Sequence, residues 1–252
     1  DLHYPLRRQR QMCIRDSPDF YDVPIKQILS KQYSKDLSDQ ISGMRTPDGQ
    51  IYEGDLKKYD ESPDTTHFSI IDSKGNAVSN TYTLGSSFGS GVTIKKGGFL
   101  MNNQMRNFSH FYGRDDMQYG TSEANKLEPG KRMISTQTPT LVFEPNGDLF
   151  MILGSPGGGR IPNIITQVIS NVIDHEMSFT EAVIAPRINQ RLEGNLQLET
   201  GFSPDTISLL IDRGHKVERS NTMGSVQAIF LDQGNIFGVA DTRRPGALAK
   251  GN

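Results

Sequence analysis

Apolar residues recur at two different spacings along this chain, and the spacing changes near residue 65. Residues 18–45 carry apolar side chains three to four positions apart, which predicts helical structure. From residue 65 onward, short apolar runs of strand length flank turn sequences and predict three antiparallel hairpins. The paired runs are 68–71 with 77–79, 138–143 with 149–153, and 226–231 with 235–240.

Three helices are expected between the second and third hairpins. An apolar stripe at helical spacing covers residues 161–172. The sequence Ser178-Phe179-Thr180-Glu181 has the form of a capping box, which opens a short helix. A third helix begins at Ser203-Pro204 and is closed by Gly214. Strands grouped in hairpins with helices between them predict an α+β layered fold.

Composition divides the chain into three segments. Residues 1–16 are rich in arginine and have no helical or strand period, so we expect a disordered or foreign leader. Residues 17–64 hold the helical region and then a polar stretch that suits an exposed linker. Residues 65–252 contain all three hairpins and the helices between them.

Overall composition narrows the class of protein. The 252 residues are 35% hydrophobic with a net charge of -2, which indicates a globular protein with a sizeable core. This balance gives no basic stripe for nucleic acid, and no apolar run approaches the roughly 18 residues of a membrane span. The single cysteine, Cys13, excludes an internal disulfide. The five histidines lack metal-ligand spacing, so no metal or other cofactor is expected.

A glycine-rich loop, Gly154-Ser155-Pro156-Gly157-Gly158-Gly159-Arg160, lies between a predicted strand and the helix at 161–172. We call residues 154–160 the glycine loop. A phosphate-binding loop would need a lysine and a hydroxyl that are missing here. A plain tight turn and an oxyanion hole made from backbone N–H groups both fit the local sequence. Ser155 itself is not in a G-x-S-x-G nucleophile elbow.

Hydroxyl and amide side chains also gather at the ends of predicted strands. Thr65 begins the first strand, and cleavage before it would free an α-amine able to act as a base for its own hydroxyl. Thr83 ends the paired strand, where it is either an ordinary strand residue or a partner for that hydroxyl. Asn102-Asn103-Gln104 follow another apolar run and are either turn formers or ligand donors.

Five motifs in fixed order resemble the gamma-glutamyltransferase (glutathione hydrolase) family. They are DTTHFS at 64–69, TYTL at 81–84, NNQM at 102–105, Ser135-Thr136, and the glycine loop, and the resemblance runs from about Ser17 to Asn252. It implies an N-terminal-nucleophile hydrolase with a four-layer αββα core. That core would be incomplete here, because most of the family's large subunit is missing from the chain. Residues 17–64 would be the C-terminal remnant of the large subunit with its linker, and residues 65–252, the expected catalytic segment, would be the small subunit.

The resemblance also implies a mechanism. The chain would cleave itself between Asp64 and Thr65, and Thr65 would then attack the γ-glutamyl amide of glutathione or a related compound. Its α-amine would be the base, and water or an amino-acid acceptor would resolve the acyl-enzyme. The remaining implied roles are Thr83 orienting the nucleophile, Gly157 and Gly158 forming the oxyanion hole, Ser135 and Thr136 holding the substrate α-carboxylate, and Gln104 contacting the α-amino group.

Two positions depart from the family pattern. Asn107, beside Arg106, stands where the family has an acidic residue for the substrate α-ammonium, and Gly85 stands where many members have asparagine. A charge-assisted hydrogen bond is worth ~1–2 kcal/mol more than a neutral one. The alternatives are therefore a glutaryl or cephalosporin-type amide acylase of the same family, and an inactive fragment with a structural role.

The resemblance further implies partners and a location. The partners are the large subunit of the same precursor, in a heterodimer, and a small γ-glutamyl substrate. Periplasmic or extracellular location follows from the resemblance alone. Residues 108–131, with Tyr119, match the family's active-site lid.

Overall fold

The computed structural model describes residues 19–20, 25–47, 65–108, 125–190 and 194–251. The predicted leader, Asp64 and Tyr119 lie outside these residues. The chain forms two compact units, each assembled from separate stretches. One unit comprises 61–103, 136–187 and 221–252, and we call it the catalytic unit because it holds Thr65, the nucleophile expected from the sequence. The second unit comprises 1–60, 104–135 and 188–220. The expected catalytic segment is therefore divided between both units.

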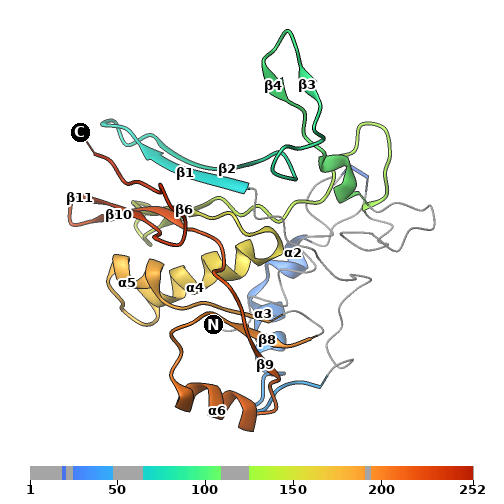
Figure 1. Cartoon of the computed structure of the whole chain (residues 1–252). Coiled ribbons are helices and arrows are strands. Elements are labelled where there is room, and N and C mark those ends of the chain that lie inside the picture. Colours follow the sequence, from blue (N-terminus) through green and yellow to red (C-terminus); the bar gives the residue numbers. More distant parts are fainter. Residues whose placement is uncertain (1–18, 21–24, 48–64, 109–124, 191–193, 252) are drawn as a thin grey trace. The chain divides into compact units, whose positions relative to one another are not determined.

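A four-stranded antiparallel sheet lies at the centre of the catalytic unit, in the order β11-β10-β6-β5 (Figure 1). Its strands are β5 (Thr140–Phe143), β6 (Leu149–Gly154), β10 (Gln227–Asp232) and β11 (Asn235–Ala240). The two hairpins predicted for these segments are confirmed. Residues 151–154 of β6 are all buried, as expected for an apolar strand covered on both faces.

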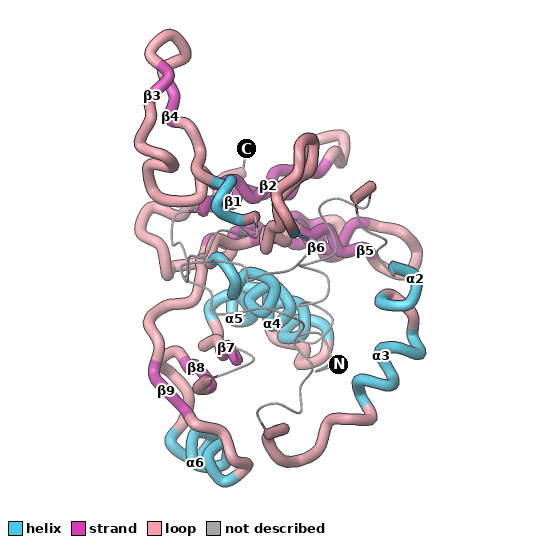
Figure 2. The backbone as a smooth tube through the Cα atoms, turned by 90° about the vertical axis from the view of Figure 1, so that its right-hand side faces the viewer, coloured by secondary structure: helices cyan, strands magenta, loops and turns pink. Residues whose placement is uncertain are grey.

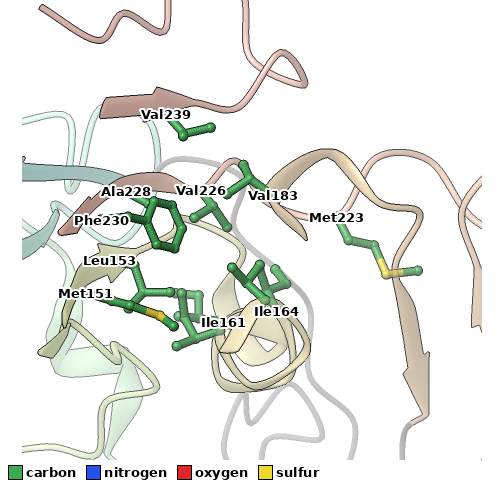
Figure 3. Close-up of a cluster of buried hydrophobic side chains, with 12 residues drawn as sticks. Met151, Leu153, Ile161, Ile164, Val183, Met223, Val226, Ala228, Phe230 and Val239 are labelled. Atoms are coloured by element: carbon green, nitrogen blue, oxygen red, sulfur yellow. The ribbon is translucent and has the colours of Figure 1, made fainter. Parts of the chain in front are cut away.

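Helices cover one face of this sheet. They are α4 (Ile161–Ile173), opened by Pro162, and α5 (Phe179–Ile184), opened by the predicted capping box at Ser178. Figure 3 shows Met151 and Leu153 of β6 directed toward the apolar stripe of α4. The cluster between them contains Met151, Leu153, Ile161, Ile164, Ile165, Val168, Val183, Met223, Val226, Ala228, Phe230 and Val239.

The hairpin of β1 (Thr65–Ile71) and β2 (Ala77–Thr83) covers the opposite face of the sheet. Figure 2 shows β1 and β2 on one side of β5 and β6, with α4 and α5 on the other. The hairpin buries polar side chains and leaves apolar ones exposed, the reverse of an ordinary surface hairpin. Its buried members are Thr65, His67 and Thr81, and its exposed large hydrophobic residues are Phe68, Ile70, Val78 and Tyr82.

A short arm extends from the end of β2. Its strands are β3 (Thr93–Ile94) and β4 (Phe99–Leu100), and the sequence pattern did not predict them. The side chain of Asn103 closes the base of the arm: its Oδ1 accepts the Ser86 N–H at 3.0 Å, and its Nδ2 donates to Ser86 Oγ at 3.0 Å. The amide at this strand end is therefore a turn former.

The second unit contains α2 (Ile25–Ile28), α3 (Lys31–Ser38), the 3-10 helix η1 (Gln104–Asn107) and α6 (Pro204–Asp212). It also has a three-stranded sheet of β7 (Ile188–Gln190), β8 (Leu196–Leu198) and β9 (Val217–Arg219). The helical structure predicted over 18–45 is present as α2 and α3, with Ser30 capping α3, but residues 39–45 are not helical. Within the described residues, no helix is long and apolar enough to cross a membrane.

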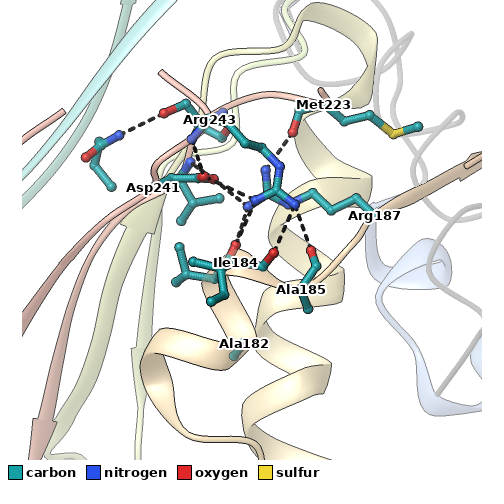
Figure 4. A network of polar contacts seen from close by, with 12 residues as sticks. Ala182, Ile184, Ala185, Arg187, Met223, Asp241 and Arg243 are labelled. Atoms are coloured by element: carbon teal, nitrogen blue, oxygen red, sulfur yellow. Dashed lines mark hydrogen bonds and ion pairs between the residues drawn. The ribbon is translucent and has the colours of Figure 1, made fainter. Parts of the chain in front are cut away.

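A buried ion network joins three parts of the catalytic unit (Figure 4). Asp241 is fully buried and pairs with Arg187 at 2.7 Å and with Arg243 at 3.1 Å. Arg187 also donates to the Met223 carbonyl at 2.6 Å, and Arg243 donates to the Ala185 carbonyl at 2.8 Å. Burial raises the pKa of Asp241, but the Arg187 charge and backbone N–H bonds outweigh it, so the net pKa is lowered.

Replacement of Arg187 by methionine should lower the free energy of unfolding by about 3–5 kcal/mol, because it removes the main partner of a buried carboxylate. Chemical denaturation monitored by circular dichroism measures this change. Lys35→Met breaks the exposed Lys35–Asp39 pair and serves as the control, with no measurable loss expected. Equal stability of the Arg187 variant and wild type would contradict the assignment.

Candidate active site

Successive inward-facing residues of β1 contact successive positions of β6. Ser69 Oγ donates to the carbonyl oxygens of Ile152 at 3.3 Å and Gln227 at 3.1 Å. Two residues earlier, the His67 imidazole fills the space where a Cβ of residue 154 would stand. Because side chains on one face of a strand recur every two residues, Thr65 is the next inward position, one step beyond the His67 contact with Gly154 in the direction of the glycine loop.

Thr65 is held by contacts from two directions. It is 5% exposed and pairs with Thr83 across the hairpin. Its carbonyl oxygen accepts a hydrogen bond from Arg244 Nη1 at 2.7 Å. The Thr83 hydroxyl accepts the Gly85 N–H at 3.0 Å. The structure thus brings Thr65 and Thr83 together, and it adds Arg244, which the sequence did not single out.

The glycine loop leaves β6 in a backbone conformation that favours glycine. Gly157 has φ 136° and ψ 15°, and Gly158 has φ 52° and begins the 3-10 helix η3 (Gly158–Arg160) that leads into α4. The Thr136 hydroxyl donates to the Gly158 carbonyl at 2.9 Å. Within the described residues, the N–H groups of Gly157 and Gly158 donate to no protein acceptor. They are therefore available to a ligand.

Three predicted substrate contacts belong to the second unit. They are Gln104, Asn107 and Ser135, whereas Thr136, the neighbour of Ser135 in sequence, is in the catalytic unit. Asn107 is buried, and its Nδ2 donates to the Ile134 carbonyl at 3.4 Å. Asn125 links the same two residues, since its amide bonds the Asn107 carbonyl and the Ile134 N–H. Asn107 therefore has a structural bond in addition to its predicted role.

Gly85 has a local physical reason for departing from the family pattern. Its φ is +97°, a conformation that side chains rarely adopt. A Cβ at this position would overlap the Oδ1 atom of Asn103, the residue that closes the arm. Gly85 therefore leaves the space that the Asn103 side chain occupies.

His67 is one of the five histidines that lack metal-ligand spacing, and its side chain is buried. Its Nδ1 lies 2.8 Å from Thr81 Oγ1, and its Nε2 lies 3.1 Å from Ser69 Oγ. Ser69 donates its only proton to a backbone carbonyl, so Nε2 carries the proton and Nδ1 accepts from Thr81. Burial lowers the pKa of His67 to about 4, which keeps the ring neutral.

Solved structures share this arrangement of strands and helices. A gamma-glutamyltranspeptidase mutant from Helicobacter pylori is 40% identical, with a TM-score of 0.65 over 71% of this chain and 100% of that chain. A cephalosporin acylase from Bacillus halodurans is 25% identical, with a TM-score of 0.78 over 100% of this chain and 44% of that chain. In fold, the chain is thus a mixed α/β protein of the kind found in these transpeptidases and acylases.

Sequence comparison is more specific. A family model described as Gamma-glutamyltranspeptidase matches residues 6–251, starting before Ser17, where the motifs placed the beginning of the resemblance. The Escherichia coli glutathione hydrolase proenzyme is 41% identical over 93% of this chain. The acylase ACY 1 proenzyme of Pseudomonas sp. strain SE83 is 36% identical over 91% of it. The chain belongs to the gamma-glutamyltranspeptidase family, and it spans about 41% of the length of the Escherichia coli relative.

Acidification should destabilise the protein through His67. The folded pKa of about 4 lies below the ordinary value of 6.5, so the unfolded chain binds the proton more readily between these values. This contribution is fully present above pH 6.5 and falls by about 3 kcal/mol as pH drops to 4. Denaturant titrations at several pH values measure the slope, and His67→Gln should have a shallower one. Parallel slopes for the two proteins would contradict a neutral buried imidazole.

Proposed function

We propose that this chain is the catalytic part of a γ-glutamyl hydrolase and transpeptidase that uses Thr65 as its nucleophile. The strongest support comes from Thr65, the buried first residue of β1, which pairs with Thr83 in the same unit as a glycine loop with two available N–H donors. Membership of the gamma-glutamyltranspeptidase family supports the same assignment. In a gamma-glutamyltranspeptidase of 40% identity, solved in its acivicin-inhibited form, the C-terminus has critical roles in autoprocessing and catalysis.

The proposed reaction starts with cleavage of the bond between Asp64 and Thr65. The freed α-amine accepts the Thr65 hydroxyl proton while Oγ attacks the γ-carbonyl carbon of the substrate. The oxygen of the tetrahedral intermediate gains negative charge and accepts the N–H groups of Gly157 and Gly158. The protonated amine then gives its proton to the leaving nitrogen, and an ester remains on Thr65. Water hydrolyses this ester, or an amino acid takes over the γ-glutamyl group.

Hydroxyl and amide side chains have the proposed roles in orienting the nucleophile and binding the substrate. Thr83 orients the nucleophile from the paired strand, and Thr136 stands beside the carbonyl of Gly158. Gln104, Asn107, Ser135 and Thr136 are the proposed contacts for the α-amino and α-carboxylate groups. Glutathione and related γ-glutamyl amides are the proposed substrates.

A glutaryl or cephalosporin-type amide is the second candidate substrate class. Asn107 favours it, because a neutral amide gives an α-ammonium group no countercharge. The acylase relatives support the possibility that the same fold accepts such acyl groups. The γ-glutamyl class remains the main proposal, since the glutathione hydrolase relatives include the higher sequence identity of 41%.

The proposed partner is the large subunit of the same precursor, bound on the outer face of the β1–β2 hairpin. This face exposes Phe68, Ile70, Val78 and Tyr82, with Ile70 and Val78 paired across the strands. An exposed apolar patch of this kind marks an interaction surface. A further sheet-and-helix contribution there would complete a four-layer αββα core.

A cleft of about 600 Å³ lies along β1 in the catalytic unit. Phe68 of β1, Ile229 of β10 and Leu248 of the C-terminal segment are among its lining residues. Thr65, Thr83, Gly157 and Gly158 are not, so we do not propose the cleft as the place where substrate reacts. Because Phe68 belongs to both surfaces, the cleft extends the proposed subunit interface.

Intact-mass spectrometry of the precursor with its native upstream sequence tests the nucleophile. The proposal predicts a cleaved fragment that begins at Thr65, because the α-amine of this residue must be free. Thr65→Ala should remain in one piece, while the control Thr66→Ala, whose side chain is exposed, should still be cleaved. An uncut wild-type precursor, or a fragment beginning elsewhere, would refute the proposal.

Paired anilide substrates test the acyl preference. The γ-glutamyl anilide should have a higher kcat/KM than the glutaryl anilide, which lacks only the α-amino group. Asn107→Asp should increase that preference roughly tenfold by supplying a countercharge. A wild-type preference above a thousandfold would rule out the relaxed pocket, and a glutaryl preference would support the acylase alternative.

A further inference from the structure

Ser155 is a fully buried serine inside the glycine loop, and the proposed mechanism does not use its hydroxyl. Its side chain is 0% exposed. Ser155 Oγ donates to the carbonyl oxygen of Pro156 at 2.6 Å and accepts the N–H of Ser225 at 3.0 Å. The hydroxyl proton is therefore used by the Pro156 carbonyl and one oxygen lone pair by the Ser225 N–H. These two bonds fix the hydroxyl in one orientation.

The hydroxyl is needed because the backbone ladder ends just before it. Gly154 and Gln227 form the last pair between β6 and β10. Pro156 has no N–H and cannot continue the ladder. The Ser155 side chain instead connects the Ser225 N–H with the Pro156 carbonyl, so a side chain continues the connection between the two strands.

Holding the Pro156 carbonyl determines where the next N–H group points. The Pro156–Gly157 peptide is trans, and in a trans peptide the C=O and N–H bonds point in opposite directions. The carbonyl is turned toward the Ser155 hydroxyl, so the Gly157 N–H is directed away from it. The next peptide is held in the same way, because the Gly157 carbonyl accepts the Arg160 N–H at 3.0 Å.

Close packing behind the loop leaves the Pro156 carbonyl little room to rotate. Gly224 has φ +67°, and a Cβ on it would lie 2.6 Å from both the Pro156 carbonyl oxygen and Ile164 Cδ1. The same Cβ would lie 2.5 Å from Ser155 Oγ. Only glycine fits between the loop and α4, and its absence of a side chain lets the two segments touch.

The geometry points to Ser155 as a positioning residue that aims the Gly157 N–H at the reacting carbonyl oxygen. This inference rests on the proposed function, because it assigns a task to the oxyanion hole formed by Gly157 and Gly158. Ser155 does not touch the substrate. It acts through the orientation of the Pro156–Gly157 peptide, which Ser225 and Gly224 hold from behind.

Steady-state kinetics of the processed enzyme with a γ-glutamyl anilide tests the inference. Loss of one oxyanion donor lowers kcat by about 100- to 1,000-fold, and a misaimed donor should cost roughly 10- to 100-fold. Ser155→Ala should therefore lower kcat by roughly 10- to 100-fold and leave KM within about twofold. Ser155→Cys fills the same space with a weak donor, so it should also lower kcat if the hydrogen bond matters more than the volume.

Ser178→Ala is the matched control, because it removes a serine hydroxyl that caps α5 in the same unit. It should reduce stability without lowering kcat, which separates weakened folding from a misaimed donor. Wild-type kcat in Ser155→Ala, an effect on KM alone, or failure of both Ser155 variants to fold and mature would overturn the inference. Turnover by Thr65→Ala would refute the proposed function instead, whatever the Ser155 variants do.

Discussion

The packing of the β1–β2 hairpin on the central sheet is the interaction on which the rest of this site depends. Hydroxyl and imidazole groups, rather than an apolar layer, make this contact. Ser69 bonds two sheet carbonyls, Ser79 bonds the Leu153 carbonyl at 3.0 Å, and His67 stacks where residue 154 has no side chain. Directional bonds of this kind fix register as well as distance, so they determine where the Thr65 end of β1 lies on the sheet.

The C-terminal segment connects β1 with the remainder of the catalytic unit. Three residues close together in sequence have three different targets: Asp241 binds Arg187, Arg243 binds the end of α5, and Arg244 binds the Thr65 carbonyl. Asp241 also accepts the Val226 N–H at 2.9 Å, close to the Ser225 N–H that holds Ser155. The residues that hold Thr65 and the glycine loop are therefore close in sequence to residues of the Asp241 network.

Much of the catalytic unit could be predicted from local sequence. Turn residues and alternating apolar runs located all three hairpins, and the apolar stripe with Pro162 located α4. The three-residue strands β7, β8 and β9 are too short for a periodic signal, and their pairing depends on contacts distant in sequence. The apolar spacing over 18–45 predicted helical structure but not its division into α2 and α3, where Ser30 caps the second helix.

The candidate site also contains residues that the sequence indicated and residues that only the structure indicated. Family motifs located Thr65, Thr83 and the glycine pair, but the roles of Ser155, His67 and Arg244 follow only from three-dimensional contacts. Gly85 looked like a lost ligand contact, and the structure explains it by the Asn103 side chain that occupies its place. Such pairings between distant residues leave no signature in a single sequence.

A crystal structure of the processed protein with a γ-glutamyl group trapped on the enzyme tests the account most directly. Thr65 Oγ should carry an ester whose carbonyl oxygen accepts hydrogen bonds from the N–H groups of Gly157 and Gly158. An acyl group attached to another residue, or a carbonyl oxygen directed away from the glycine loop, would contradict it.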